Sequence, residues 1–202
     1  SCPACGAEVI KTEAFHRCTN VACPAQALEK LKHFVSRGAM DIDGVGEKLC
    51  TALFEQGLVK DAADLYYLSF DQLMSMERMA DKSASNVLQS IENSKNRPLS
   101  RVIFALGILH VGNETADLLA SRFSSIDGLA RATEEELLNI PSVGPKIVES
   151  IFAFFRQEGN RRILEKLRAA GVRLEEEAPA KPAQMLLSGK EFVLTGKLQS
   201  CT

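Results

Sequence analysis

Asp43-Gly44-Val45-Gly46-Glu47-Lys48-Leu49 is the stretch that decides the fold of this 202-residue chain, because its pattern returns along the sequence. The pattern is a glycine, a hydrophobic residue, a second glycine and then the start of a helix. Copies run from Leu109 to Ala116 and from Pro141 to Ile147, and a degenerate copy runs from Arg78 to Ala84. The position of the second glycine is Gly46, Ala80, Gly112 and Gly144 in the four copies, so successive copies lie 34, 32 and 32 residues apart. A near-constant period of this size predicts one supersecondary unit used four times.

Each such turn is expected to present backbone N–H groups at the start of a helix, where they and the helix dipole favour an anion. Lys48, Lys82 and Lys146 stand two residues after the aligned position, from which a lysine can reach a neighbouring phosphate. The pattern is typical of the helix-hairpin-helix motif, which holds the DNA backbone without reading bases. The alternative is a set of helix caps in a plain bundle, but four copies in register favour phosphate binding.

The four copies are not equivalent. We expect the second, which has lost both glycines, to be mainly a packing unit, although Lys82 and Arg78 could still touch phosphate. His110 is expected to be a turn residue rather than a ligand. Six arginines are further candidates for phosphate contact, with an ordinary surface role favoured for each: Arg97, Arg101, Arg122, Arg156, Arg161 and Arg162. The predicted DNA-binding residues are Gly44, Val45, Gly46, Lys48, Val111, Gly112, Asn113, Val143, Gly144 and Lys146.

Four of the six cysteines fall in the first 23 residues as two close pairs, spaced C-x2-C and C-x4-C. Two such pairs can turn four sulfurs toward one tetrahedral zinc ion, and Gly6 permits the sharp turn after the first pair. Two disulfides in a secreted domain are the alternative, but no signal peptide is visible. His16 could replace one sulfur, although four thiolates already fill a structural site. The predicted zinc ligands are Cys2, Cys5, Cys18 and Cys23.

The rest of the chain divides by pattern. A helix is predicted from residue 26 to 38, and short amphipathic helices alternate with tight turns up to about Val172. A polar, proline-containing stretch follows, and Glu191 to Gly196 is predicted to be one β-strand. The expected fold is mainly α: a four-Cys zinc finger over 1–26, an all-α helix-hairpin-helix domain over 27–174, a linker over 175–187 and the truncated start of another domain over 188–202. We expect the chain to be part of a longer polypeptide.

Composition narrows the classes of protein. A hydrophobic content of 46% and a charged content of 25% are ordinary globular values. The apolar runs are far shorter than the roughly 18 residues of a membrane span. Residues 27–173 hold 19 basic and 20 acidic side chains, which excludes a DNA binder that relies on bulk positive charge. A binder whose attraction is local to its turns remains compatible with that balance.

The order of these features resembles the C-terminal half of bacterial NAD-dependent DNA ligase. The most specific part is the segment from His33 to Gly46, which follows the four-Cys knuckle and precedes the repeated turns. The segment from Gly189 to Gly196 is similar to the first strand of that family's BRCT domain. The resemblance implies an enzyme that seals nicks in duplex DNA during replication and repair, by way of an adenylated lysine formed from NAD. It also implies structural zinc on the four cysteines.

The family's adenylated lysine lies in a K-x-D-G motif, which this sequence lacks; Asp41-Ile42-Asp43-Gly44 has Asp in place of Lys. The resemblance therefore implies that NAD and a divalent metal such as magnesium act in an N-terminal part outside this chain. This chain alone is expected to clamp nicked double-stranded DNA without joining it. We further expect a monomer in the bacterial cytoplasm, associated with the nucleoid and not with a membrane.

Two alternatives remain open at this point. One is another DNA-repair protein built on helix-hairpin-helix repeats, such as a nuclease subunit or a junction-binding protein. The other is a zinc-knuckle module whose helical repeats bind a protein partner. Binding to phosphates should weaken steeply with salt, and this separates the DNA-binding hypotheses from the protein-interaction hypothesis.

Overall fold

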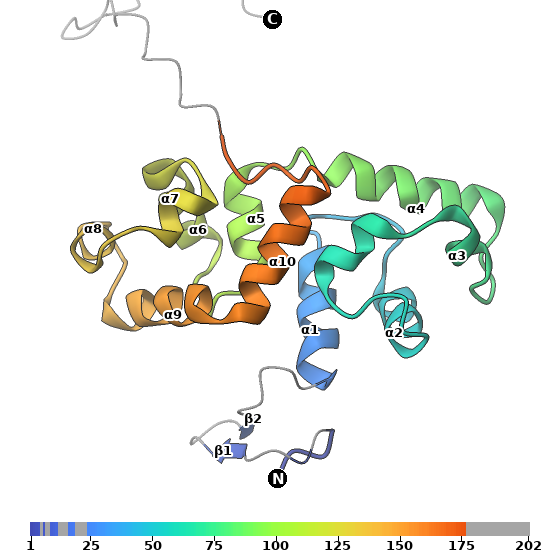
Figure 1. The fold of residues 1–202 in the computed structure, drawn as a ribbon, viewed down its shortest axis with the longest axis horizontal. Coiled ribbons are helices and arrows are strands. Elements are labelled where there is room, and N and C mark those ends of the chain that lie inside the picture. Colours follow the sequence, from blue (N-terminus) through green and yellow to red (C-terminus); the bar gives the residue numbers. More distant parts are fainter. Residues whose placement is uncertain (5, 7–8, 12–15, 19–23, 177–202) are drawn as a thin grey trace, which may run out of the picture.

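The computed structural model describes residues 1–4, 6, 9–11, 16–18 and 24–176 (Figure 1). Near the N-terminus, β1 (Val9–Lys11) pairs antiparallel with β2 (His16–Cys18), so that Val9 lies opposite Cys18. The sequence did not predict this short hairpin. The predicted BRCT strand over 191–196 and most of the predicted linker lie outside the described residues.

Residues 24–176 are mainly helical, which confirms the predicted fold class for this part of the chain. None of the helices described is long and apolar enough to cross a membrane. The elements are α1 (Pro24–Val35), α2 (Glu47–Glu55), the 3₁₀ helix η1 (Ala62–Tyr67), α3 (Phe70–Met74), α4 (Asp81–Ser94), α5 (Leu99–Ala105), α6 (Asn113–Phe123), α7 (Ile126–Ala130), α8 (Glu134–Leu138), α9 (Pro145–Arg156) and α10 (Glu158–Ala169).

Four of the short helices begin at a side chain that caps them. Asp61, Ser69, Ser125 and Thr133 each accept hydrogen bonds from backbone N–H groups in the first turn of η1, α3, α7 and α8, respectively. Such caps satisfy donors that a helix start otherwise leaves without partners. Five- and six-residue helices need this help because each gains few internal hydrogen bonds.

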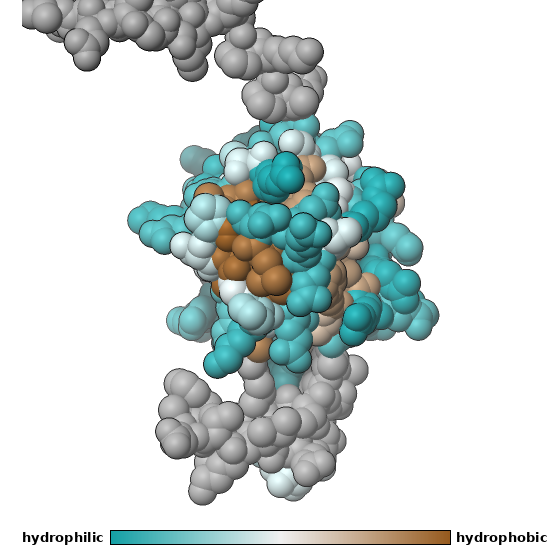
Figure 2. Space-filling view, turned by 90° about the vertical axis from the view of Figure 1, so that its left-hand side faces the viewer, coloured by the Kyte–Doolittle hydropathy of each residue, from teal (hydrophilic) through white to brown (hydrophobic). Residues whose placement is uncertain are grey.

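The core lies around α1 and α10, which occupy the middle of the molecule between α2–α4 on one side and α5–α9 on the other (Figure 1). Leu31 and Phe34 of α1 are almost completely buried, and α1 packs against α2, α5 and η1. Figure 2 shows the end formed by α7–α9, where a hydrophobic patch lies within a largely hydrophilic surface. At this end Leu138 closes α8 with 41% of its surface exposed.

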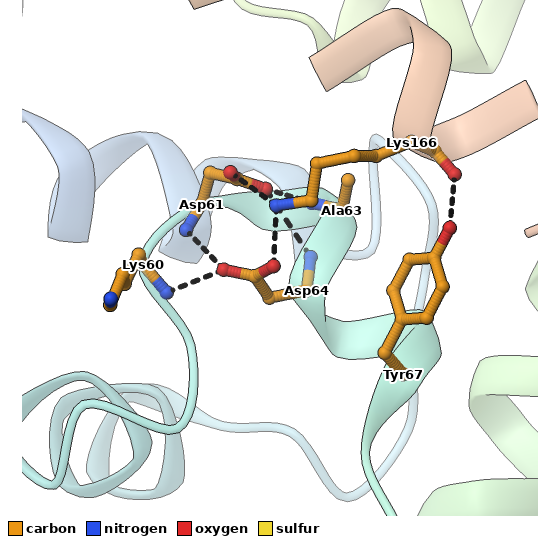
Figure 3. Close-up of polar contacts among 6 residues, drawn as sticks. All are labelled: Lys60, Asp61, Ala63, Asp64, Tyr67 and Lys166. Carbon is orange, nitrogen blue, oxygen red and sulfur yellow. Dashed lines mark hydrogen bonds and ion pairs between the residues drawn. The ribbon is translucent and has the colours of Figure 1, made fainter. Parts of the chain in front are cut away.

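A polar network ties α10 back to the first half of the chain (Figure 3). The Lys166 ammonium lies 2.6 Å from Asp61 Oδ2 and also contacts the Asp64 carboxylate. The Tyr67 hydroxyl donates to the Lys166 carbonyl oxygen at 2.9 Å. Burial opposes both charged forms, yet the hydrogen bonds and charges of the network leave the pKa of Asp64 below its ordinary value and the pKa of Lys166 above it.

After α10 the chain runs across the helical domain and bonds to it. The Arg173 amide donates to the Lys95 carbonyl oxygen at 2.8 Å, and the Glu176 amide donates to the Ser124 carbonyl oxygen at 2.9 Å. The Glu176 carboxylate accepts the first amide of α5, that of Leu99, at 2.8 Å. Packing on the helical domain therefore continues two residues past the predicted boundary at 174.

Candidate nucleic-acid interface

The four repeated turns share one backbone geometry. Their first positions all adopt left-handed backbone, although only one of them is glycine. The φ angles are +83° at Gly44, +63° at Arg78, +65° at His110 and +66° at Ser142. In each turn the next amide donates to the carbonyl oxygen three residues earlier, as from Val45 to Ile42 at 3.3 Å. The turn predicted at His110 is thus present, and the backbone of the other three turns has the same conformation.

The middle residue of each turn fastens it to the core. Val45, Val111 and Val143 are buried, and Met79 packs against the core from a partly buried position. These hydrophobic side chains therefore serve the fold. Any contact that Val45, Val111 or Val143 makes with a ligand would have to come from the backbone.

The helices after the turns begin without side-chain caps. Gly46, Ala80, Gly112 and Gly144 are the N-cap residues of α2, α4, α6 and α9, and none of the four helix starts has a capping side-chain hydrogen bond. In contrast, η1, α3, α7 and α8 are capped by a side chain, although α5 and α10 also begin without one from their N-cap residue. No N-cap side chain occupies the first amides of the four hairpin helices, and an anion is the acceptor that the helix dipole favours there; in α9 the first residue, Pro145, has no amide to offer.

Space beside these helix starts is open. A Cβ atom added at Gly46, Gly112 or Gly144 would meet nothing within 4 Å. At Gly44 the same atom would lie 2.8 Å from Val87 Cγ2, and the φ angle there is left-handed. The fold therefore requires glycine at position 44, because of the left-handed φ and the nearby Val87 side chain. Gly46, Gly112 and Gly144 leave room for a ligand to approach the backbone.

Three of the four turns carry an exposed lysine in the first turn of the following helix. Lys48, Lys82 and Lys146 make no ion pair within the described part of the chain. In α6 the equivalent residue is Glu114, also exposed. A hollow of about 360 Å³ borders the first turn, and its charged lining mixes two basic and three acidic side chains: Lys32, Arg37, Asp41, Asp43 and Glu47. Turns one, two and four thus share an exposed lysine at the helix start rather than a broad basic surface.

The second turn is more complete than its sequence indicates. We expected a packing unit, yet Arg78 adopts the left-handed conformation and Ala80 starts α4 just as the glycines start the other helices. Arg78 and Lys82 are both exposed. The alignment of Ala80 and Lys82 with the other copies was the signal that could have identified this turn as a candidate contact.

The candidate arginines are partly used within the protein. Arg97 donates to the carbonyl oxygens of Met40 and Asp41 and forms an ion pair of 2.8 Å with the Asp41 carboxylate. It therefore holds the loop that leads into the first turn. Arg101 contacts the Arg37 carbonyl oxygen, and Arg162 pairs with Glu158 on its own helix.

The four predicted zinc ligands are described only in part. Cys2 is buried, Cys18 lies in β2, and Cys5 and Cys23 lie outside the described residues. The Gly6 amide donates to the Cys2 carbonyl oxygen at 2.8 Å, and Gly6 has a φ of +72°. This is the tight turn that the C-x2-C-G spacing predicts, and it fits a pair of thiolates that face one ion. Zinc binding itself stays a prediction.

Cys50 is separate from that set. It is fully buried on α2, and burial raises the pKa of its thiol to about 11. Cys50 is therefore a small core residue.

Comparison with known proteins matches the same division of the chain. The family model for the NAD-dependent DNA ligase C4 zinc finger domain matches residues 1–25. A SAM-like helix-hairpin-helix tandem model matches residues 37–93, which include the first two turns, and a helix-hairpin-helix motif model matches residues 101–164, which include the other two.

Curated relatives are similar along the whole chain. A protein named DNA ligase from Dehalococcoides mccartyi (strain CBDB1) is 51% identical over 202 residues, which is 99% of this chain and 30% of the relative. DNA ligase from Halothermothrix orenii is 53% identical over 100% of this chain and 31% of its own length. DNA ligase from Geobacter sulfurreducens is 53% identical over 98% and 29%, respectively. This chain therefore spans about 30% of the length of the relatives that it matches.

Proposed function

Because this chain matches the C-terminal part of NAD-dependent DNA ligases, we propose that it is the portion of such an enzyme that clamps nicked duplex DNA by its backbone. The observation that carries the proposal is the set of four equivalent turns, each followed by a helix whose first amides have no side-chain cap. Backbone amides and helix dipoles attract phosphate in any base sequence, so the binding is not sequence-specific.

The turns would share the work of binding. At the first turn, the amides after Gly46 meet phosphate while Lys48 reaches an adjacent one. At the fourth turn, where Pro145 has no N–H, the amides of Gly144 and Lys146 meet phosphate and the Lys146 ammonium reaches an adjacent one. The third would use the amides at Gly112 and Asn113, with buried Val111 holding the turn in place. The second would add Arg78 and Lys82. Four binding turns spread over one domain explain how a neutral protein can hold DNA, because its attraction is concentrated at those points.

The four cysteines would hold one structural zinc ion, with a Cys2–Cys5 knuckle closed by Gly6 and the other pair contributed from β2 and the residues before α1. Four thiolates leave no open position, so zinc would supply rigidity to the finger and no chemistry to the joining reaction. We propose a finger over 1–26, a domain of four helix-hairpin-helix units over 27–176, a linker over 177–187 and the start of a BRCT domain from 188. The domain is extended from 174 to 176 because residues 175 and 176 bond to it.

The whole enzyme would seal nicks with phosphodiester bonds, using NAD and a divalent metal such as magnesium in a part that carries the K-x-D-G lysine. Lacking that motif, the 202-residue chain should not form an adenylate with labelled NAD. Addition of the adenylating part should restore nick joining. A labelled adduct on this chain alone would overturn the assignment. We also propose that the chain is monomeric and acts in the bacterial cytoplasm at the nucleoid.

Titration of fluorescent nicked duplex with the chain over increasing salt tests the clamp. One phosphate per turn predicts a slope of log affinity against log salt of about −3 or steeper, since each contact contributes about −0.9. An unlabelled duplex of different sequence should compete equally. If the chain does not bind nicked duplex at low salt, the proposed function is wrong and the protein-interaction alternative is favoured.

A further inference from the structure

The third turn differs chemically from the other three. The residue two positions after its aligned glycine is Glu114, whereas the other turns carry lysine there. The residue three positions before that glycine is Leu109, and the other turns carry Asp43, Glu77 and Pro141 there. The third turn therefore combines a negative charge where a cation would be expected with a large hydrophobic side chain at its tip.

Leu109 is not needed by the core of its own turn. Its neighbours Ile108 and Val111 are 3% and 7% exposed and fasten the turn, while Leu109 itself is 42% exposed. His110, which has left-handed backbone, follows Leu109. Helix α6 begins without a side-chain cap at Asn113, four residues after Leu109. A single exposed leucine is common on protein surfaces and does not by itself indicate a function. The position of Leu109 does indicate one, because Leu109 lies in the same turn as the amides proposed to bind phosphate.

We infer that Leu109 packs against the deoxyribose carbons next to the phosphate that the third turn binds, an inference that rests on the proposed function. The sugar is the apolar surface closest to a backbone phosphate, and a leucine that packs against its carbons removes apolar area from water on both sides of the contact. Glu114 repels phosphate, so this turn needs a contact that does not depend on charge. Burial of Leu109 supplies that contact.

The test is the affinity of the 202-residue chain for nicked duplex and its dependence on salt. Leu109→Ala should lower the affinity by about three- to tenfold, the range expected for loss of part of a leucine's burial. The slope of log affinity against log salt should stay unchanged, because no ion contact is lost. Leu109→Gln, which keeps the length of the side chain, should lower the affinity similarly. Leu109→Lys should steepen the slope by about 0.9.

Leu138→Ala is the matched control, since Leu138 has nearly the same exposure, 41%, and lies outside the four turns. It should bind as the unchanged protein does. Lys146→Ala is the second control and should flatten the salt slope by about 1 without involving Leu109. Thermal unfolding of every variant shows whether any of them has lost the fold.

Unchanged affinity in both Leu109→Ala and Leu109→Gln would overturn the inference. A steep slope in the unchanged protein, flattened by Lys146→Ala, would then still support the DNA clamp. Equal losses in Leu109→Ala and Leu138→Ala would also overturn it, because the effect would not belong to the turn. If the unchanged protein does not bind at low salt, the proposed function and this inference fail together.

Discussion

Gly44 and Gly46 stand two residues apart and are glycine for different reasons. Gly44 has a φ of +83° and faces Val87 at a distance that a Cβ atom could not keep. Gly46 has extended backbone and open space around it. The first glycine therefore serves the fold, and the second leaves open space at the start of α2.

Substitution at the two positions should separate stability from binding. Gly44→Ala should lower the free energy of unfolding by about 2 kcal/mol, through a left-handed φ and overlap with Val87. Gly46→Val should cost about 1 kcal/mol or less as a poorer N-cap, yet weaken DNA binding at least about tenfold by blocking the amides. Urea denaturation and duplex titration measure the two quantities. If Gly46→Val lowers the free energy of unfolding as much as it lowers the free energy of DNA binding, the turn at Gly46 is only a structural cap.

Lys48 can be tested by its contribution to salt dependence. Lys48→Gln should weaken binding to all duplex sequences alike and flatten the log–log salt slope by about 1. Lys95→Gln is the control, because Lys95 pairs with Glu92 at the C-terminal end of α4, outside the four repeated turns. An identical change in the two variants would mean that general charge, rather than the turn, governs binding.

At the scale of elements, helix capping differs between the short helices and those that follow the repeated turns. Four short helices are capped by Asp61, Ser69, Ser125 or Thr133, whereas the helix of each repeated turn starts at glycine or alanine. A capping side chain at Gly112 should therefore compete with DNA. Gly112→Asp is expected to stabilise α6 by up to about 1 kcal/mol and to weaken binding, since its carboxylate occupies the amides and repels phosphate. Stronger binding by this variant would contradict the role given to the helix start.

The zinc finger is a separate element with its own test. Cys5→Ser should remove zinc and loosen residues 1–26, because a structural site of this kind supplies folding energy to its small domain. The helical domain should keep its unfolding transition, since none of the described residues before α1 belongs to the core that includes Leu31 and Phe34. Metal content measured by atomic emission checks the first point and circular dichroism the second. One zinc per chain in the variant would show that the ligand assignment is wrong.

At the scale of the whole molecule, Lys166 joins α10 to η1 and so adds a polar contact between the two halves of the helical domain, which also share one hydrophobic core. Lys166→Met should lower the free energy of unfolding by about 1 kcal/mol, a modest figure because the charged groups are partly exposed to solvent. It should also weaken DNA binding if all four turns must face one duplex together. Unchanged binding would mean that the two halves act independently.

The same network predicts a pH dependence. The pKa of Asp64 is lowered in the folded protein, so its contribution to stability is complete above the unfolded value of about 3.9 and is lost as pH falls through the folded pKa. The pKa of Lys166 is raised, so its contribution is complete below about 10.4 and is lost as pH rises through the folded pKa. The difference in urea midpoint between the unchanged protein and Lys166→Met should therefore shrink below about pH 4. A constant difference down to pH 2 would contradict the network.

The sequence by itself determined what depends on neighbouring residues: the helical class, the period of the turns, the paired cysteines and the lysines after the aligned glycines. Such features are local, because a turn needs a left-handed residue and a helix start within a few positions. Only the tertiary structure decided that Arg97 pairs with Asp41, that Glu176 caps α5 and that Lys166 reaches Asp61. It also showed that the second turn has the same backbone conformation as the others, although it contains no glycine. Those outcomes depend on contacts between segments far apart in the chain, and no short pattern encodes which distant partners packing will bring together.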